Sequence, residues 1–200
     1  FHVIPSPAPV FEGVYRVPQG HAVCHDGHEV KTLRYWTPHF EPQAGAGFEA
    51  LASEFRETLR QAVANQLDGT KAACYLSGGT DSSTVAGMIS KLTDGAASSY
   101  SIGFDAAGYD EMAFARIASK HFSTQHHEYY VTPADLVSGI PRVAGAFDQP
   151  FGNSSAVPAY YCARMAQADG VSRLLAGDGG DELFGGNARY AKQKLFDLYQ

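Results

Sequence analysis

The feature that most constrains the fold is a short apolar run that leads directly into a pair of glycines. Residues 72–76, Ala-Ala-Cys-Tyr-Leu, are typical of a buried strand. Ser77-Gly-Gly-Thr-Asp-Ser-Ser83 follows, and residues 84–92 then predict a helix. Glycine allows close approach of the backbone to a ligand and positive φ, and the first amides of a helix attract anions. The sequence therefore predicts an anion-binding loop between a strand and a helix.

This loop differs from the Walker A loop, Gly-x-x-x-x-Gly-Lys-Ser/Thr, because no lysine follows its glycines. It contains the acid Asp81 instead. A carboxylate beside bound phosphates requires a cation between them, and Mg²⁺ is the expected one because it prefers oxygen ligands. The structural alternative is an ordinary Gly-Ser turn without a ligand.

Strands and helices alternate along the rest of the chain. Further strands are predicted over residues 98–104, 126–131 and 171–176, and helices over 109–121, 133–146, 154–168 and from 183 onward. An earlier helix over 48–67 carries an apolar stripe expected to be core: Phe48, Leu51, Phe55, Leu59, Val63 and Leu67. The pattern predicts an α/β fold with a parallel sheet flanked by helices, which binds ligands at the carboxyl ends of its strands.

Residues 1–43 have a different character and predict a short β-rich fragment of another domain. Strand-like runs cover residues 14–17, 21–24 and 30–36, and Asp-Gly within residues 25–28 indicates a hairpin turn. Cys24, His25 and His28 could be considered as metal ligands, but no second ligand pair follows at zinc spacing, so the turn is preferred. Residues 41–47 form a Pro/Gly/Ala linker.

Composition excludes several classes of protein. The 200 residues suit one full domain, or one domain plus a fragment, and both ends look cut. The net charge of −6, without a long basic run, argues against a nucleic-acid surface. No apolar stretch reaches about eighteen residues, so no membrane span is expected. The three scattered cysteines indicate a reducing, cytoplasmic environment.

A second glycine-rich segment follows the strand predicted at 171–176. Its residues are Gly177-Asp-Gly-Gly-Asp-Glu-Leu-Phe-Gly-Gly186. Such glycines let the backbone approach a nucleotide or a metal. Asp178 and Asp181 are expected to face the strand end where the first loop also opens. The alternative is a solvated Asp/Gly turn.

The first loop resembles the pyrophosphate loop of the N-type ATP pyrophosphatases. With the second segment and the runs at 101–104, 109–111 and 147–151, Ser-Ile-Gly-Phe, Tyr-Asp-Glu and Phe-Asp-Gln-Pro-Phe, it occurs in the order of the glutamine-hydrolysing asparagine synthetases. Residues 11–21 and 34–36 resemble the end of that family's glutaminase domain. The resemblance, over nearly the whole chain, implies a glutaminase remnant at 1–43 and a truncated N-terminal part of the synthetase domain at 44–200.

The resemblance also implies a reaction. Such enzymes adenylate aspartate with Mg-ATP, giving β-aspartyl-AMP and pyrophosphate, and ammonia from glutamine then displaces AMP to form asparagine. By this resemblance the ATP-binding residues are Leu76, Ser77, Gly78, Gly79, Asp81, Ser82, Ile102, Ala176 and Gly177. The Mg²⁺ ligands would be Asp81 and Asp181, and the catalytic residue would be Asp178. A homodimer is left open.

The sequence departs from the family pattern in three ways. The family's usual acid in the second segment is glutamate, whereas this chain has Asp178, after Ala176 in place of serine. The N-terminal glutaminase cysteine is absent, since residue 1 is Phe1, and the lysine that neutralises pyrophosphate would lie beyond Gln200. The chain alone is therefore not expected to be a complete catalyst.

Two alternative functions stay open. One is a related amidotransferase or amide-bond cyclase that adenylates another carboxylate, which the Asp178 departure favours. The other is a non-catalytic nucleotide-binding module, against which Asp81 and Asp181 count. Among the other polar residues, His126 and His127 are expected to be structural, and the sequence predicts solvated charges at Lys120, Arg164 and Arg173.

Overall fold

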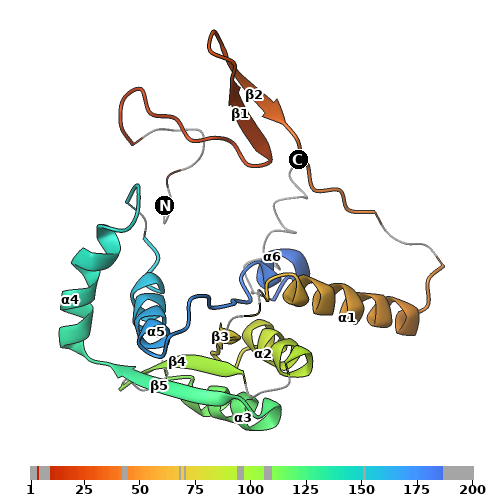
Figure 1. The fold of residues 1–200 in the computed structure, drawn as a ribbon, viewed down its shortest axis with the longest axis vertical. Helices are drawn as coiled ribbons and strands as arrows, with labels where there is room; N and C mark the ends of the chain where they lie inside the picture. Colours follow the sequence, from red (N-terminus) through yellow and green to blue (C-terminus); the bar gives the residue numbers. More distant parts are fainter. Residues whose placement is uncertain are drawn as a thin grey trace, which may run out of the picture.

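The computed structural model describes residues 4, 10–41, 45–67, 69, 71–93, 97–105, 110–150 and 152–186. A two-stranded hairpin, β1 (His21–His25) and β2 (Val30–Arg34), precedes a region in which helices and strands alternate (Figure 1). The elements of that region are α1 (Phe48–Ala64), β3 (Ala73–Tyr75), α2 (Thr80–Leu92), β4 (Ser98–Phe104), α3 (Met112–Phe122), β5 (Gln125–Val131), α4 (Pro133–Ala144), α5 (Ala156–Ala168) and α6 (Gly180–Phe184).

The central sheet has three parallel strands in the order β3–β4–β5. β4 pairs with β5 along its whole length, whereas its pairing with β3 ends at Tyr75 and Tyr100. On the other side of β3, Leu175 forms an isolated parallel bridge to Cys74. The carboxyl ends of all three strands therefore meet at one edge, and the predicted α/β fold with a parallel sheet flanked by helices is confirmed.

Helices cover both faces of this sheet (Figure 1). On one face α2 and α3 bury Ile89 and Met112 against Cys74 and Leu76. On the other face α5 packs against Tyr100, which is completely buried, and α4 joins α5 further along the sheet. Burial raises the pKa of the Cys74 and Cys162 thiols to about 12, so both stay protonated at neutral pH.

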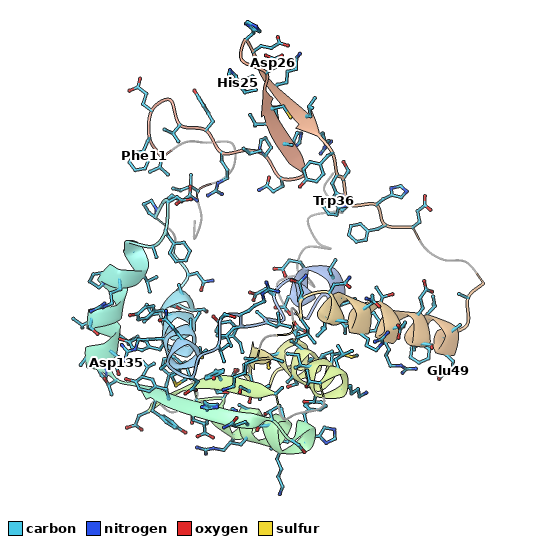
Figure 2. The ribbon with its side chains drawn as sticks, viewed as in Figure 1. Phe11, His25, Asp26, Trp36, Glu49 and Asp135 are labelled. Atoms are coloured by element: carbon cyan, nitrogen blue, oxygen red, sulfur yellow. The ribbon has the colours of Figure 1, made fainter. Side chains whose placement is uncertain are left out.

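The β1–β2 hairpin confirms the turn predicted at residues 25–28. Asp26 lies at its tip (Figure 2), and its Oδ1 accepts backbone N–H bonds from His28 (2.9 Å) and Glu29 (3.0 Å). Pairing runs from His21–Arg34 to His25–Val30 in a sheet separate from β3–β5. The strand expected at 14–17 does not form. Assignment of this region to a glutaminase domain stays a prediction.

The apolar stripe of α1 was expected to be core, and most of it is not. Phe48 is 80% exposed and Phe55 46% exposed, whereas Val63, near the end of the helix, is buried. Phe55 makes an edge-to-face contact with Phe184 of α6, with ring centroids 5.3 Å apart. The prediction was wrong because helical spacing identifies an apolar face, while burial depends on what packs against that face.

Several predicted boundaries also differ from the structure. α2 begins at Thr80 rather than at residue 84, because Gly79 adopts the extended conformation of an N-cap residue (φ −69°, ψ 164°). Residues 171–176 form a single bridge at Leu175 rather than a strand. α1 ends at Ala64, and α6 begins at Gly180 rather than at 183. Some predicted segments include residues 42–44, 109, 151 and 187–200, which lie outside the described part of the chain.

α4 shows the start signal that its sequence indicates. Pro133 is the first helical residue, and Thr132 forms a reciprocal capping box with Asp135, which Figure 2 labels at the start of the helix. Asp135 N–H donates to Thr132 Oγ1 at 3.2 Å, and Thr132 N–H donates to Asp135 Oδ2 at 2.9 Å. None of the helices in the described part of the chain is long and apolar enough to cross a membrane.

The two histidines of β5 make structural contacts. His126 Nδ1 lies 2.8 Å from Ser99 Oγ, and the His127 ring stacks on Tyr100 with centroids 4.7 Å apart. His127 Nδ1 also lies 3.1 Å from Asp169 Oδ2. Of the three cationic residues expected to be solvated, Lys120 is exposed on α3. The other two are exposed but engaged: Arg164 lies over the Tyr161 ring and Arg173 donates to the Gln66 carbonyl.

Candidate active site

The loop between β3 and α2 is held open by two serines. Ser82, in the first turn of α2, accepts the N–H of Ser77 at 3.2 Å through its hydroxyl, which also shares a 2.9 Å hydrogen bond with Ser77 Oγ. Ser77 Oγ in turn accepts the N–H of Gly79 at 3.3 Å. No side chain caps the N-terminus of α2. The loop is therefore organised by its own hydroxyls, and the first amides of α2 are left for a ligand.

Gly78 meets two requirements that exclude larger residues. Its φ of +84° lies in the left-handed region. A Cβ atom there would lie 2.5 Å from the backbone nitrogen of Ala115 and would also meet Phe114. The loop therefore packs directly on the first turns of α3. This contact is the physical reason for the first glycine of the pair.

The second glycine-rich segment packs against the first. Leu175 exchanges two backbone hydrogen bonds with β3, to Tyr75 N–H at 3.0 Å and to Ala73 C=O at 2.9 Å. The chain then turns through Gly177, where a Cβ would lie 2.7 Å from the carbonyl carbon of Asp81. Gly180, at the start of α6, lies against the Asp81 carboxylate. The two segments that were singled out in the sequence thus form one surface.

A cavity of about 490 Å³ opens at this surface, at the carboxyl ends of β3 and β4. Its volume is within the range of about 300–1,000 Å³ that small-molecule sites occupy. Residues from both glycine-rich segments, β4, α3 and α5 line it: Tyr75, Leu76, Ser77, Asp81, Ser82, Tyr100, Ser101, Ile102, Glu111, Met112, Ala115, Ser155, Pro158, Ala159, Cys162, Ala176, Gly177 and Asp178.

The structure brings most of the predicted site residues together around this cavity. The eight that line it are Leu76, Ser77, Asp81, Ser82, Ile102, Ala176, Gly177 and Asp178. Gly78 and Gly79 lie behind the wall, where they shape the loop. Asp181 does not line the cavity; it is on the first turn of α6, and its Oδ1 lies against Gly186. Asp81 is half-buried and sits in the first turn of α2, not in the loop as expected.

The sequence did not single out the wall formed by α5. Ser155, Pro158 and Cys162 line the cavity from this helix, and no motif marked them. Glu111 and Ser101 belong to runs that were noted in the sequence without a role for these residues. Tyr75, which also lines the cavity, has a raised pKa, chiefly because burial disfavours its charged form.

A second cavity, of about 630 Å³, lies on the other side of the same wall. Asp81, Ala176, Gly177 and Asp178 line both cavities. The second cavity is otherwise mainly apolar, and its lining includes side chains from α1, α2 and α6: Phe55, Leu59, Val63, Val85, Leu183 and Phe184. The two acids, Asp81 and Asp178, therefore stand in the wall that separates the two cavities.

The donors and acids of the first cavity suit a phosphate ligand bound with a cation. Hydroxyls and helix N-terminal amides favour anions, and Asp81 and Asp178 would repel an anion that came without a metal. Within the described residues no group of three or more His, Cys, Asp or Glu side chains is arranged to hold a metal. Mg²⁺ fits this arrangement, because it binds through one or two carboxylates and takes its other ligands from phosphates and water.

Comparison with known proteins indicates the family of the chain. The sequence profile of the asparagine synthase family matches residues 54–200. A putative asparagine synthetase (glutamine-hydrolyzing) 2 of Methanocaldococcus jannaschii is 34% identical over 188 residues, which cover 92% of this chain and 36% of the relative. Asparagine synthetase (glutamine-hydrolyzing) 1 of Bacillus subtilis is 26% identical, over 93% of this chain and 29% of the relative.

A relative with a different name has a sequence identity between those of the two synthetases. Amidase chry2 of Gibberella zeae is 29% identical over 92% of this chain and 30% of its own length. The chain thus spans about a third of the length of these curated relatives. The family profile covers both glycine-rich segments and every residue that lines the 490 Å³ cavity. This chain belongs to the asparagine synthase family.

Proposed function

We propose that the protein containing this chain is an ATP-dependent amide-forming ligase that adenylates aspartate and transfers glutamine-derived ammonia to it. The family supports an amide-forming ligase in general. The single observation that carries the proposal is the cavity wall, where the serine-organised loop meets Asp81 and Asp178. The products would be asparagine, AMP and pyrophosphate.

In this proposal different residues of the chain bind the phosphates, hold the metal and orient the reacting groups. Ser77, Ser82 and the first amides of α2 would hold the β- and γ-phosphates, and the adenosine would lie toward Ile102 and Gly177. Mg²⁺, bound through Asp81 and assisted by Asp181, would neutralise charge on the phosphates. Asp178 would orient either the acid whose carboxylate attacks the α-phosphorus or the ammonia that then attacks the acyl carbon of the adenylate and displaces AMP. Catalysis of this kind depends on alignment and charge neutralisation.

A second candidate differs only in the acid that is adenylated. The motif carries Asp178, one methylene shorter than the family's usual glutamate, and the identity to Amidase chry2, 29%, is comparable to the 26% identity to the Bacillus subtilis synthetase. Both observations favour an acceptor other than aspartate. A glutaminase origin for residues 1–43, a cytoplasmic location and a homodimer complete the proposal.

The test is pyrophosphate release by the full-length protein with Mg-ATP and ammonia, screened over a panel of carboxylic acids. We expect one acid, aspartate in the first proposal, to release pyrophosphate and AMP in equal amounts and to yield its amide. Release with another acid alone would favour the second candidate. ATP cleavage to ADP and phosphate, or binding of ATP without acid-dependent release by any acid, would overturn both.

A further inference from the structure

The pairing of β3 with β4 ends in an unusual way at the edge of the cavity. The last backbone bond between them runs from Leu76 N–H to Tyr100 C=O, at 3.0 Å. In a parallel ladder the next bond would join the Leu76 carbonyl to the N–H of Ile102. The Leu76 carbonyl instead accepts a hydrogen bond from the side-chain hydroxyl of Ser101.

This hydrogen bond fixes one end of a peptide whose other end is also held by a serine. The peptide that joins Leu76 to Ser77 is planar, so that its C=O and N–H point in opposite directions. Ser101 Oγ donates to the C=O, and Ser82 Oγ accepts the N–H at 3.2 Å. The two hydroxyls together set the plane of the first peptide of the loop, and that plane sets the direction in which Ser77 and Gly78 continue.

Ser101 is placed to act on the cavity as well as on the loop. It is 3% exposed and lines the cavity, as do Leu76 and Ile102. Because β3 has ended, the side of the Ile102 main chain that would continue the ladder faces the cavity. A buried carbonyl without a hydrogen bond is costly, so the chain at Leu76 would turn back toward Ile102 if the hydroxyl were lost.

We propose that Ser101 is a positioning residue for nucleotide binding: its hydroxyl holds the Leu76 carbonyl, orients the entry to the 77–79 loop and keeps the Ile102 main chain open to the ligand. The inference deepens the proposed function and rests on it for the identity of the ligand. It assigns no contact between Ser101 and the reacting atoms.

A second buried serine on the same strand provides a matched control. Ser99 is completely buried and lies two residues earlier, on the same face of β4. Its hydroxyl contacts Thr124 Oγ1 at 2.7 Å and His126 Nδ1 at 2.8 Å, and it does not line the cavity. The Ser99→Ala variant therefore shows what the loss of a buried serine hydroxyl does to folding when that hydroxyl has no contact with the cavity.

The experiment uses the full-length protein and the variants Ser101→Ala, Ser101→Thr, Ser101→Val and Ser99→Ala. Mg-ATP affinity is measured by calorimetry, thermal unfolding is measured without ligand, and KM for Mg-ATP and kcat come from pyrophosphate release. We expect Ser101→Ala to weaken Mg-ATP binding about tenfold, as the loss of one buried hydrogen bond implies, and to raise KM more than it lowers kcat. Ser101→Thr should restore binding, and Ser99→Ala should leave it unchanged.

The remaining outcomes each decide the question. Should Ser101→Ala fail to fold, the comparison of Ser101→Thr with Ser101→Val replaces it. Threonine and valine have nearly the same shape, but only threonine carries a hydroxyl. Ser101→Thr should therefore bind Mg-ATP normally, and Ser101→Val should not. Equal affinity in the Ala, Val and wild-type proteins, or an equal loss in Ser99→Ala, would overturn the inference. A wild type that binds Mg-ATP but releases no pyrophosphate with any acid would overturn the ligase proposal alone, because the binding comparison stands without it.

Discussion

Gly180 lies directly against the carboxylate of Asp81. A Cβ atom at position 180 would meet Asp81 Oδ2 and Cγ, and would lie 2.9 Å from Oδ1. The start of α6 and the start of α2 are therefore in contact through a side chain that is proposed to bind Mg²⁺, and the space for that side chain exists because residue 180 is glycine.

Gly180→Ala is expected to displace the Asp81 carboxylate without unfolding the protein, because the atoms it meets are the movable end of a side chain. Mg-ATP affinity in the full-length protein should fall by roughly tenfold or more, since small displacements of a positioned group are costly. Calorimetry gives the affinity and thermal unfolding gives the stability. Gly47→Ala, at a position with no atom within 4 Å of the new Cβ, is the control. Unchanged affinity in Gly180→Ala would show that the contact is irrelevant to the ligand.

Asp81→Asn should separate the metal from the nucleotide. Removal of the carboxylate should weaken binding of Mg-ATP by about tenfold or more, because a metal ligand is lost. Binding of ATP in the presence of a chelator should not weaken, because the substitution removes a negative charge near the phosphates. Calorimetry with and without Mg²⁺ measures both affinities. The Asp181→Asn variant measures how much the second acid contributes to Mg-ATP affinity. Equal losses with and without Mg²⁺ would argue that Asp81 is not a metal ligand.

Asp178→Asn is expected to act on the chemical step rather than on binding. Asp178 is at the wall that the two cavities share, so its carboxylate is placed to orient a reacting group. ATP affinity should stay nearly intact, while the ammonia-dependent rate should fall by roughly 10²-fold or more, as for positioned acid–base groups. Ammonia replaces glutamine in this assay so that the proposed glutaminase domain does not contribute.

A turn-forming aspartate predicts the opposite result, because asparagine supports such turns equally well. Asp26 of the hairpin is such a residue, since its Oδ1 accepts two backbone N–H bonds. Asp26→Asn is therefore the matched control and should leave the rate unchanged. Near-normal turnover of Asp178→Asn would remove this residue from the proposed catalytic group.

Stability should depend on pH through His126. Burial lowers the pKa of this imidazole below its ordinary value of 6.5, against the opposing attraction of Glu128. The unfolded chain therefore binds a proton at a pH at which folded His126 does not, and stability should be lost as the pH falls from 6.5 toward the folded pKa. Denaturation of the full-length protein at pH 7.5 and at pH 5.5 measures this loss.

His126→Asn should reduce the difference in stability between those two pH values, because the titrating group is gone. His28→Asn, at an exposed position in the hairpin, is the control and should leave the difference as it is in the wild type. An identical pH dependence in His126→Asn and the wild type would contradict the assignment of the loss to this histidine.

The parts of the site that could be predicted from the sequence are those with strong local signals. Glycine next to serine or aspartate after an apolar run marks a loop at a strand end, and parallel strands bring such loops to one edge. Asp81 and Asp178 could therefore be placed on a common surface. The start of α2 was missed because Asp81 and Ser82 are typical loop residues, although both suit the first turn of a helix.

The parts that could not be predicted depend on tertiary contact. The periodicity of α5 is that of any packed helix, and nothing in it shows that Ser155, Pro158 and Cys162 border a cavity. The stripe of α1 is a helical face whose burial its own sequence does not determine. The hydroxyl of Ser101 likewise gains its role from the point at which β3 stops, and that point is set by pairing between strands.

The wall contributed by α5 has a consequence for how such a protein can change over evolution. Among the described residues no hydrogen bond links Ser155, Pro158, Ala159 or Cys162 to the serine-organised loop. Substitutions in this helix can thus reshape the cavity while the loop keeps its geometry. If the proposed function holds, selection for a new acid could act on α5 one residue at a time, and a lineage could diversify its products while the proposed ATP-binding loop stays unchanged.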